Sequence, residues 1–248
     1  MKKLLISLFV RIWLWLFLVI YGWSNPAIAA VTAKDYQQFW LWAGVHPPIS
    51  ILQHSQILYI LQGEIGGNAH QPQLNIQGVS PVLFSNQQLW LVWRVQRLDW
   101  SPVIVNTIIN RTRLWQQKGN QIKGVQIDFD ARTLQLNKYA DFLRQLRQQL
   151  PVNWQISITG LLDWTKTGDI NSINQLNGVI DELVVQTYQG RHTLNNYVDY
   201  LTSLNRLTIP FKIGLVQGGD WDTTWQKRLQ QQPLYQGEVV FLLNQAKQ

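Results

Sequence analysis

Residues 124–130 read Gly-Val-Gln-Ile-Asp-Phe-Asp, and this stretch indicates how the whole chain folds. Apolar and polar residues alternate in it, which is the period-two pattern of a β-strand. The apolar positions are Val125, Ile127 and Phe129, and the polar positions are Gln126, Asp128 and Asp130. Because helical patterns lie on both sides, we expect a central parallel strand. Its apolar face should be covered by helices, and its polar face should point inward.

The two carboxylates of this stretch are the first candidates for function. Asp128 and Asp130 lie two residues apart at the C-terminal end of the predicted strand, so both should point into one cleft. Like charges at such a separation shift each other's pKa values, and unequal pKa values are what acid–base chemistry requires. A structural alternative is that Arg94 or Arg191 pairs with these carboxylates in that cleft.

Length and composition favour one folded globular domain. The chain has 248 residues, of which 46% are hydrophobic and 14% are charged. The absence of cysteine excludes disulfides, thiolate catalysis and cysteine-based zinc sites. The histidines are scattered without metal-ligand spacing, so we expect no metal and no other cofactor. A divalent cation held by Asp128, Asp130 and Asp163 is a second interpretation.

The charge pattern argues against a nucleic-acid partner. Lys2, Lys3 and Arg11 supply three of the +7 charges, and residues 1–30 contain no acidic residue, so the rest of the chain carries +4. The remaining basic residues occur singly, mostly on predicted helix faces, as on a solvated surface.

Residues 1–30 have the features of an export signal. A short basic start precedes an apolar run at about residues 12–23, and Ala27-Ile28-Ala29 follows as a signal peptidase motif. We expect a cleaved signal at residues 1–30 and a single domain at residues 31–248; an uncleaved membrane anchor is the alternative. In either case the domain should be exported, to the periplasm or the medium, and should meet the membrane only through an uncleaved segment.

Eight strand-like runs, separated mostly by helical patterns, predict an α/β fold. The runs cover residues 39–45, 57–62, 89–95, 124–130, 154–161, 182–188, 211–216 and 238–243, with helices expected at 101–118, 136–150, 170–176, 194–204 and 223–229. This order is typical of a small (β/α)8 TIM-like barrel. Residues 63–86 are rich in Gly, Pro, Asn and Gln, so a loop or small hairpin should replace the second helix.

The C-terminal ends of barrel strands carry the active sites of this fold. In chain order the residues at or just after these ends are Arg94, Asp128, Asp130, Asp163, Trp164, Gln186, Tyr188, Arg191, Gln217 and Trp221. Gln126 shares the inward face of the central strand. Carboxylates and amides bind hydroxyls, and indoles stack on pyranose rings, so this set suits a sugar ligand. Among the tryptophans, Trp100, Trp164 and Trp221 are the expected platforms, whereas Trp40, Trp42, Trp90 and Trp93 are assigned to the core.

Residues 123–130 resemble a degraded form of the strand-four motif of the family 18 (chitinase-like) glycoside hydrolases, Asp-Gly-x-Asp-x-Asp-x-Glu. The resemblance implies that Asp128 orients the N-acetyl group of the substrate and that Asp130 occupies the position of the catalytic Glu. Tyr188 falls where the family has a tyrosine that helps to hold the reacting acetamido group. Lys123 and Gln126 replace the first two aspartates of the motif, and Asp130 is one methylene shorter than Glu.

A second resemblance extends over most of the exported part. It is carried by residues 39–42 (FWLW), 126–131 (QIDFDA), 157–159 (SIT), 163–164 (DW), 186–191 (QTYQGR) and 210–215 (PFKIGL). These runs are similar to a bacterial domain-of-unknown-function family, number 3142. The resemblance implies a barrel fold and no particular chemistry.

Three functions are compatible with these residues. The first is a glycoside hydrolase-like protein acting on a cell-wall or extracellular polysaccharide. In it Asp130 is the general acid, Asp128 and Tyr188 complete the catalytic set, and the other strand-end residues bind substrate. A conventional two-carboxylate mechanism would add Asp163 or Asp220. The second function is a carbohydrate-binding barrel without catalysis, and the third is a periplasmic structural or interaction protein. The sequence does not specify an oligomeric state.

Overall fold

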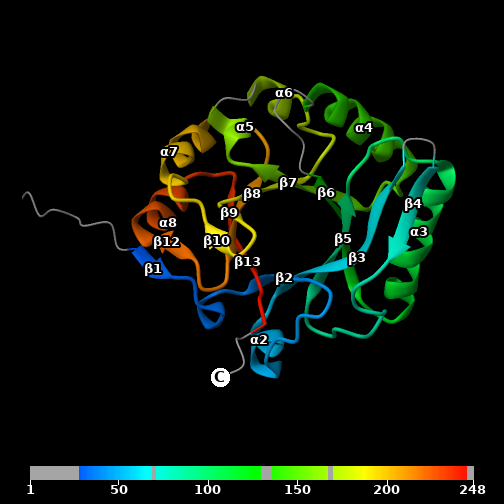
Figure 1. Ribbon diagram of the computed structural model, residues 1–248, viewed down its shortest axis with the longest axis horizontal. Coiled ribbons are helices and arrows are strands. Elements are labelled where there is room, and N and C mark those ends of the chain that lie inside the picture. Colours follow the sequence, from blue (N-terminus) through cyan, green and yellow to red (C-terminus); the bar gives the residue numbers. More distant parts are fainter. Residues whose placement is uncertain (1–27, 69–70, 130–135, 167–169, 245–248) are drawn as a thin grey trace, which may run out of the picture.

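The computed structural model describes residues 28–68, 71–129, 136–166 and 170–244, and these form a closed barrel of eight parallel strands with helices outside it (Figure 1). Each strand pairs with the next in chain order, and β13 pairs with β2 to close the ring. The barrel strands are β2 (Gln38–Leu41), β3 (Ile57–Asn68), β5 (Gln88–Val95), β6 (Gln121–Phe129), β7 (Gln155–Leu161), β8 (Glu182–Gln186), β11 (Phe211–Val216) and β13 (Tyr235–Phe241). The predicted TIM-like barrel is confirmed.

The helices lie on the outer surface of the barrel (Figure 1). They are α2 (Ile49–His54), α3 (Pro102–Gln117), α4 (Leu136–Gln149), α5 (Asp163–Lys166), α6 (Ile170–Asn174), α7 (Val198–Leu201) and α8 (Thr223–Leu229), with 3-10 turns η1 (Ala33–Asp35) and η3 (Thr202–Arg206). The helix predicted at residues 194–204 begins only at Val198, and α2 was not predicted. Ser101 precedes α3 without capping it through its side chain, although Pro102 does occupy the first turn.

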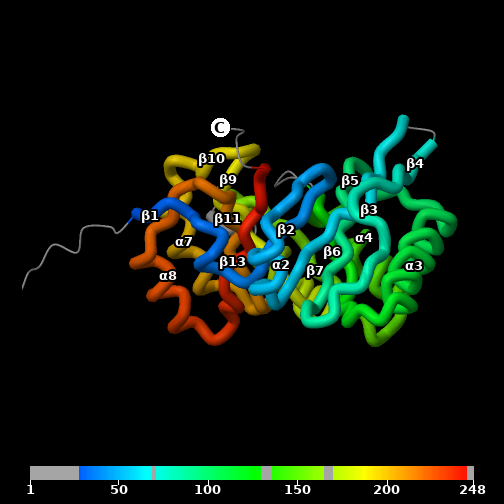
Figure 2. The backbone as a smooth tube through the Cα atoms, turned by 90° about the horizontal axis from the view of Figure 1, so that it is seen from below, coloured from blue at the N-terminus to red at the C-terminus, as the bar shows by residue number. Residues whose placement is uncertain are grey.

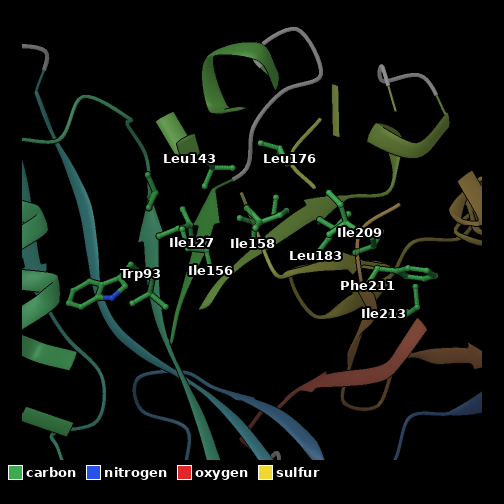
Figure 3. Close-up of a cluster of buried hydrophobic side chains, with 14 of the residues drawn as sticks. Trp93, Ile127, Leu143, Ile156, Ile158, Leu176, Leu183, Ile209, Phe211 and Ile213 are labelled. Atoms are coloured by element: carbon green, nitrogen blue, oxygen red, sulfur yellow. The ribbon is translucent and has the colours of Figure 1, made fainter. Parts of the chain in front are cut away.

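The alternation in β6 has the predicted orientation. Val125 and Ile127 are fully buried in the apolar layer between the barrel and the helices, where Leu143 of α4 also lies (Figure 3). Gln126 is equally buried, but it lies inside the barrel and contacts polar groups there. The apolar face of the strand therefore packs against helices, as in other parallel barrels, while the interior of the barrel is partly polar.

A hairpin and a loop replace the second helix, as the sequence predicts. β3 continues past the barrel to Asn68 and pairs antiparallel with β4 (Gln71–Ile76). The loop that follows is held by the buried Gln62, whose Oε1 accepts hydrogen bonds from Trp115 Nε1 at 2.6 Å and Arg111 Nε at 2.9 Å. Gln62 Nε2 in turn donates to the carbonyl of Val79 at 3.2 Å. The side-chain amide of Gln62 thus links both α3 and the loop to barrel strand β3 by hydrogen bonds.

Short strands add to the rim of the barrel. β9 (Tyr188–Gln189) and β10 (His192–Thr193) form a hairpin. In Figure 2 this hairpin and the β3–β4 hairpin both lie on the upper side of the barrel. β1 (Ile28–Ala30) pairs antiparallel with β12 (Asp220–Asp222), so the folded part reaches back to residue 28. None of the described helices is long and apolar enough to cross a membrane; most of the predicted export signal, residues 1–27, lies outside the described residues.

Burial of Glu238 gives the fold a pH dependence. Burial raises the pKa of the Glu238 carboxyl above its ordinary value of 4.5, although the Tyr235 hydroxyl donates a hydrogen bond to it. The folded state therefore holds this proton more tightly than the unfolded chain does. It follows that the free energy of unfolding falls as the pH rises from 4.5 through the raised pKa, and the loss persists at neutral pH.

We expect Glu238→Gln to be more stable than the natural protein at pH 7, because the amide keeps an acceptor for Tyr235 and cannot ionise. The gain should shrink as the pH falls to about 4, where the carboxyl is protonated in both states. Urea unfolding at the two pH values measures both quantities. Asp199→Asn, at an exposed carboxylate, is the control. A variant that is less stable than the natural protein at pH 7 would contradict the prediction.

Candidate functional site

A cavity of about 570 Å³ opens at the C-terminal ends of the barrel strands. Its position is that of the active site in barrels of this kind, and its volume is in the range of small-molecule sites. Its lining residues are Trp40, Trp42, Arg94, Asp128, Thr159, Leu161, Leu162, Asp163, Gln186, Tyr188, Gln189, Gly190, Leu194, Asn196, Tyr200 and Phe241.

The lining has an aromatic side and a polar side. Trp42 follows β2, Phe241 ends β13 and Tyr188 follows β8, and these rings are in contact. Phe241 lies edge-on to Trp42 with ring centroids 5.4 Å apart, and it stacks on Tyr188 at 5.8 Å. Charged groups and a hydroxyl come from β5, β6 and β7, on the other arc of the ring. A ligand in the cavity therefore meets π-faces on one side and hydrogen-bonding groups on the other.

Asp128 is the central group of the polar side. Its Oδ1 accepts a hydrogen bond from Thr159 Oγ1 of the neighbouring strand at 2.8 Å. Arg94 of β5 lies directly beside it in the strand register and also lines the cavity. Behind β6, burial and then the charge of Asp128 raise the pKa of the Tyr139 hydroxyl well above 10. Tyr139 is therefore a neutral packing residue, and Asp128 is the member of this pair that lines the cavity.

The structure brings together five of the predicted site residues around the cavity, namely Arg94, Asp128, Asp163, Gln186 and Tyr188. Gln126 lies beneath the cavity floor, where its side chain is fully buried and bonded to Trp40 and Ser157. Its predicted role as a direct ligand contact is therefore wrong. Asp130 lies outside the described residues; Phe129 before it is the last residue of β6.

For two tryptophans, the prediction that the indole stacks on a ligand is wrong. Trp164 and Trp221 are each 1% exposed, so neither can stack on a ligand. Trp164 packs edge-on against Tyr139 at 6.2 Å, and Trp221 stacks on Tyr197 at 5.6 Å. The third, Trp100, packs against Phe142 with its Nε1 bonded to the carbonyl of Arg97. All three rings belong to or pack against the apolar cluster between the barrel and the helices.

Two other predicted binding residues lie elsewhere. Arg191 is exposed on the turn between β9 and β10. Gln217 lines a separate cavity of about 690 Å³ beside His46 and Pro48, where its Oε1 accepts a hydrogen bond from the backbone of Leu243 at 3.0 Å. Neither residue is among those that line the cavity above the barrel.

Sequence reasoning missed the aromatic side of the cavity. Trp42 is assigned to the core and Phe241 is not singled out, although both line the cavity. Trp40 also borders the cavity, but it is only 1% exposed, so its assignment to the core is confirmed. Trp40 and Trp42 have the same parity on a strand whose intervening residue, Leu41, is buried. Because the same alternation continues past the end of β2, it was the feature of the sequence that could have placed Trp42 at the cavity. Trp90 and Trp93 are buried, as predicted.

The cavity gives no geometric indication of a metal. Among the described residues, no group of three His, Cys, Asp or Glu side chains is arranged to hold an ion. Of the three carboxylates considered for a cation, Asp128 and Asp163 line the cavity and Asp130 lies outside the described part.

Comparison with known proteins places the chain in a family. Residues 90–214 match Domain of unknown function (DUF3142). The chain belongs to this family. A search of curated protein sequences finds no match.

Several solved structures are similar to this DUF3142 protein. A xylanase-alpha-amylase inhibitor protein in complex with trehalose is 10% identical, with a TM-score of 0.53 over 83% of this chain and 92% of that chain. The chitinase domain of the spore coat protein CotE from Clostridium difficile is 13% identical, with a TM-score of 0.46 over 84% and 72%. The Bacillus cereus spore cortex-lytic enzyme SleL is 15% identical, with a TM-score of 0.45 over 72% and 49%. At these identities the likeness concerns the fold alone.

Gly214 of β11 is where a small change should disturb the cavity floor. A Cβ atom at this position would lie 2.9 Å from two ring carbons of Trp40. We expect Gly214→Ala to destabilise the DUF3142 protein by about 1–3 kcal/mol, because a rigid indole inside a closed barrel has little room to move. Gly66→Ala, whose methyl would meet only the flexible side chain of Gln96, is the matched control. Equal costs in urea unfolding would show that the Trp40 ring is not held tightly.

Proposed function

We propose that this protein acts on or binds a cell-wall or extracellular polysaccharide at the cavity above the barrel, as a glycoside hydrolase-like protein. The observation that carries the proposal is the two-sided lining of that cavity. A pyranose ring has apolar faces of C–H groups and an edge of hydroxyls. The rings of Trp42, Tyr188 and Phe241 suit the first, and the groups around Asp128 suit the second.

In the catalytic form of the proposal, Asp130 protonates the glycosidic oxygen and Asp128 stabilises the positive charge that develops on the sugar. The hydrogen bond from Thr159 fixes the Asp128 carboxylate in position for this role. Tyr188 and Gln186 position the substrate from the next strand. Asp163 is the candidate second carboxylate, for which the two common mechanisms require a separation of roughly 5–10 Å.

A second candidate is a sugar-binding barrel without catalysis, and the environment of Gln126 favours it. The strand-four motif of family 18 glycoside hydrolases has an aspartate at this position, whereas here the Gln126 amide is buried and bonded on both sides. That position serves packing in this chain and is not available to the substrate.

We further propose that the protein is exported, on the strength of residues 1–30. The pairing of β1 with β12 involves residues 28–30, so a test of function is best made on the full-length protein. Truncation at residue 31 would remove this strand.

The decisive experiment is a screen of the full-length protein against peptidoglycan fragments, chitin oligosaccharides and exopolysaccharide fragments. Calorimetry measures binding, and a reducing-end assay measures hydrolysis. We expect Asp130→Asn to abolish hydrolysis and to retain binding, and Asp128→Asn to weaken both. Asp199→Asn, at an exposed carboxylate outside the cavity lining, is the matched control. Binding without new reducing ends would identify a receptor, and no binding to any fragment would refute the proposed function.

The aromatic side of the cavity has its own test. We expect Trp42→Ala to weaken binding of a chitin or peptidoglycan fragment roughly tenfold, equivalent to about 1.4 kcal/mol, through loss of the stacking face. Trp225→Ala is the control, since Trp225 is a partly buried indole on α8, which covers the outside of the barrel. If both substitutions lower the affinity equally, Trp42 is not a ligand contact.

A further inference from the structure

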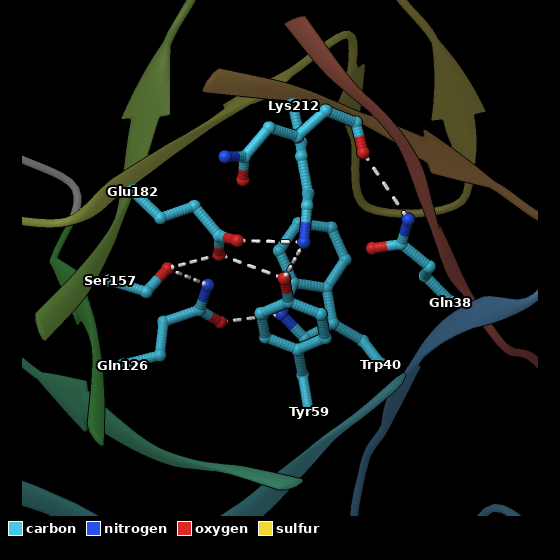
Figure 4. A network of polar contacts seen from close by, with 8 residues as sticks. Gln38, Trp40, Tyr59, Gln126, Ser157, Glu182 and Lys212 are labelled. Carbon is cyan, nitrogen blue, oxygen red and sulfur yellow. Dashed lines mark hydrogen bonds and ion pairs between the residues drawn. The ribbon is translucent and has the colours of Figure 1, made fainter. Parts of the chain in front are cut away.

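A chain of polar contacts crosses the barrel interior beneath the cavity (Figure 4). It starts at an ion pair of 2.7 Å between Lys212 Nζ and Glu182 Oε2, with both side chains 2% exposed. The Tyr59 hydroxyl accepts a hydrogen bond from Lys212 and donates one to Glu182 Oε1, each at 2.8 Å. Lys212, Glu182 and Tyr59 are therefore joined to one another by direct contacts.

From Glu182 the contacts continue towards the cavity floor. Ser157 Oγ donates to Glu182 Oε1 at 2.8 Å, and Gln126 Nε2 donates to Ser157 Oγ at 2.9 Å. Gln126 Oε1 then accepts from Trp40 Nε1 at 2.6 Å. Glu182, Ser157 and Gln126 come from the adjacent strands β8, β7 and β6, and the last bond crosses the interior to Trp40 on β2.

The charge of Glu182 gives every bond in this chain its direction. An ionised carboxylate only accepts, so Ser157 must give it its single proton. The serine oxygen is then an acceptor, and Gln126 must turn its NH2 group towards it. The Gln126 carbonyl consequently faces the other way, towards Trp40, whose indole N–H only donates. Each bond also polarises the next, which strengthens the whole chain.

Trp40 is the point at which this chain meets the cavity. Trp40 lines the cavity, and Gly214 lies so close to its ring that a Cβ atom would approach to 2.9 Å. On its other sides the ring packs against Tyr59 at 5.7 Å and against Tyr188 at 6.5 Å. The orientation of the indole therefore depends on its one hydrogen bond and on the packing around it.

We propose that Glu182 is a positioning residue for the cavity, acting through Ser157 and Gln126 to fix the Trp40 indole at its floor. The ligand named below rests on the proposed function, whereas the orientation of Trp40 can be measured without a ligand. A buried ion pair gives little net stability compared with apolar residues of the same volume. The ion pair does, however, hold the groups bonded to it in one arrangement, which apolar residues could not do.

The test uses the full-length protein with ¹⁵N-labelled tryptophan, in which the Trp40 indole resonance is assigned by its loss in Trp40→Phe. Ser157→Ala interrupts the series of hydrogen bonds between Glu182 and Trp40 and leaves the ion pair in place. The double variant Glu182→Gln with Lys212→Met removes both charges together, so that neither is left buried alone. We expect the Trp40 indole N–H resonance to move upfield in both variants as its hydrogen bond weakens.

Trp115 provides an internal control in the same spectra. Its Nε1 also donates to a glutamine, Gln62, at 2.6 Å, but this bond lies outside the Glu182 chain. Its resonance should not move. Equal shifts of Trp40 and Trp115 would indicate general loosening and would overturn the proposal. So would an unchanged Trp40 resonance in either variant, because Glu182 would then not act through Ser157.

Binding provides a readout at the cavity itself, with chitotetraose as the probe. Both variants should bind it roughly threefold to tenfold more weakly than the natural protein, about the effect of one hydrogen bond. Unchanged affinity would show that the orientation of Trp40 does not matter to this ligand and would overturn the positioning role. If the natural protein binds no chitotetraose, the proposed function fails for this sugar, while the resonances still decide the inference about Glu182.

Discussion

A closed barrel separates the side chains inside it from water, so every polar group in the interior must find its partner there. This constraint is strongest for Lys212 and Glu182, which lie at the start of their strands and are almost completely buried. Burial lowers the pKa of the Lys212 ammonium, and the Glu182 carboxylate opposes that shift. The two charges therefore need each other, and strands β8 and β11, which carry them, must keep their register for the pair to form.

The same constraint determines where the molecule is open. The lower interior is filled by the ion pair and by large rings, including Tyr59 stacked on Trp90 at 6.1 Å. The cavity lies above Trp40, at the C-terminal ends of the strands. Its two-sided lining follows from the ring order, since the aromatic residues come from the arc of β8, β13 and β2 and the charged ones from the arc of β5 to β7. The filled lower interior thus determines the floor of the cavity, and the order of the strands in the ring determines its two walls.

Local patterns were enough to predict the fold but only part of the site. The alternation in β6 and the Ser101-Pro102 start of α3 are encoded within a few residues, and so each strand of the barrel could be placed from sequence. The burial of Trp164 and Trp221 in the outer apolar layer could not be predicted in this way, because it depends on the path of the chain after each strand ends. The same limit hid Phe241, which reaches the cavity only because β13 closes the ring beside β2. Arg94, Asp128 and Tyr188 were found because strand parity alone directs them inward.

Two of the positions at which this chain departs from the family 18 motif, Lys123 and Gln126, have identifiable structural roles. Lys123 replaces the first aspartate of the motif, and its ammonium lies over the Trp90 ring at 5.5 Å from the centroid. Gln126 replaces the second aspartate, and only a side chain with both a donor and an acceptor can bridge Ser157 and Trp40 there. A carboxylate at position 126 would repel the acceptor face of Ser157 and place a second negative charge near Glu182. The interior network and the altered motif are therefore two aspects of one arrangement, in which the lower part of the strand supports the barrel. Within the described part of β6, Asp128 is the residue that lines the cavity.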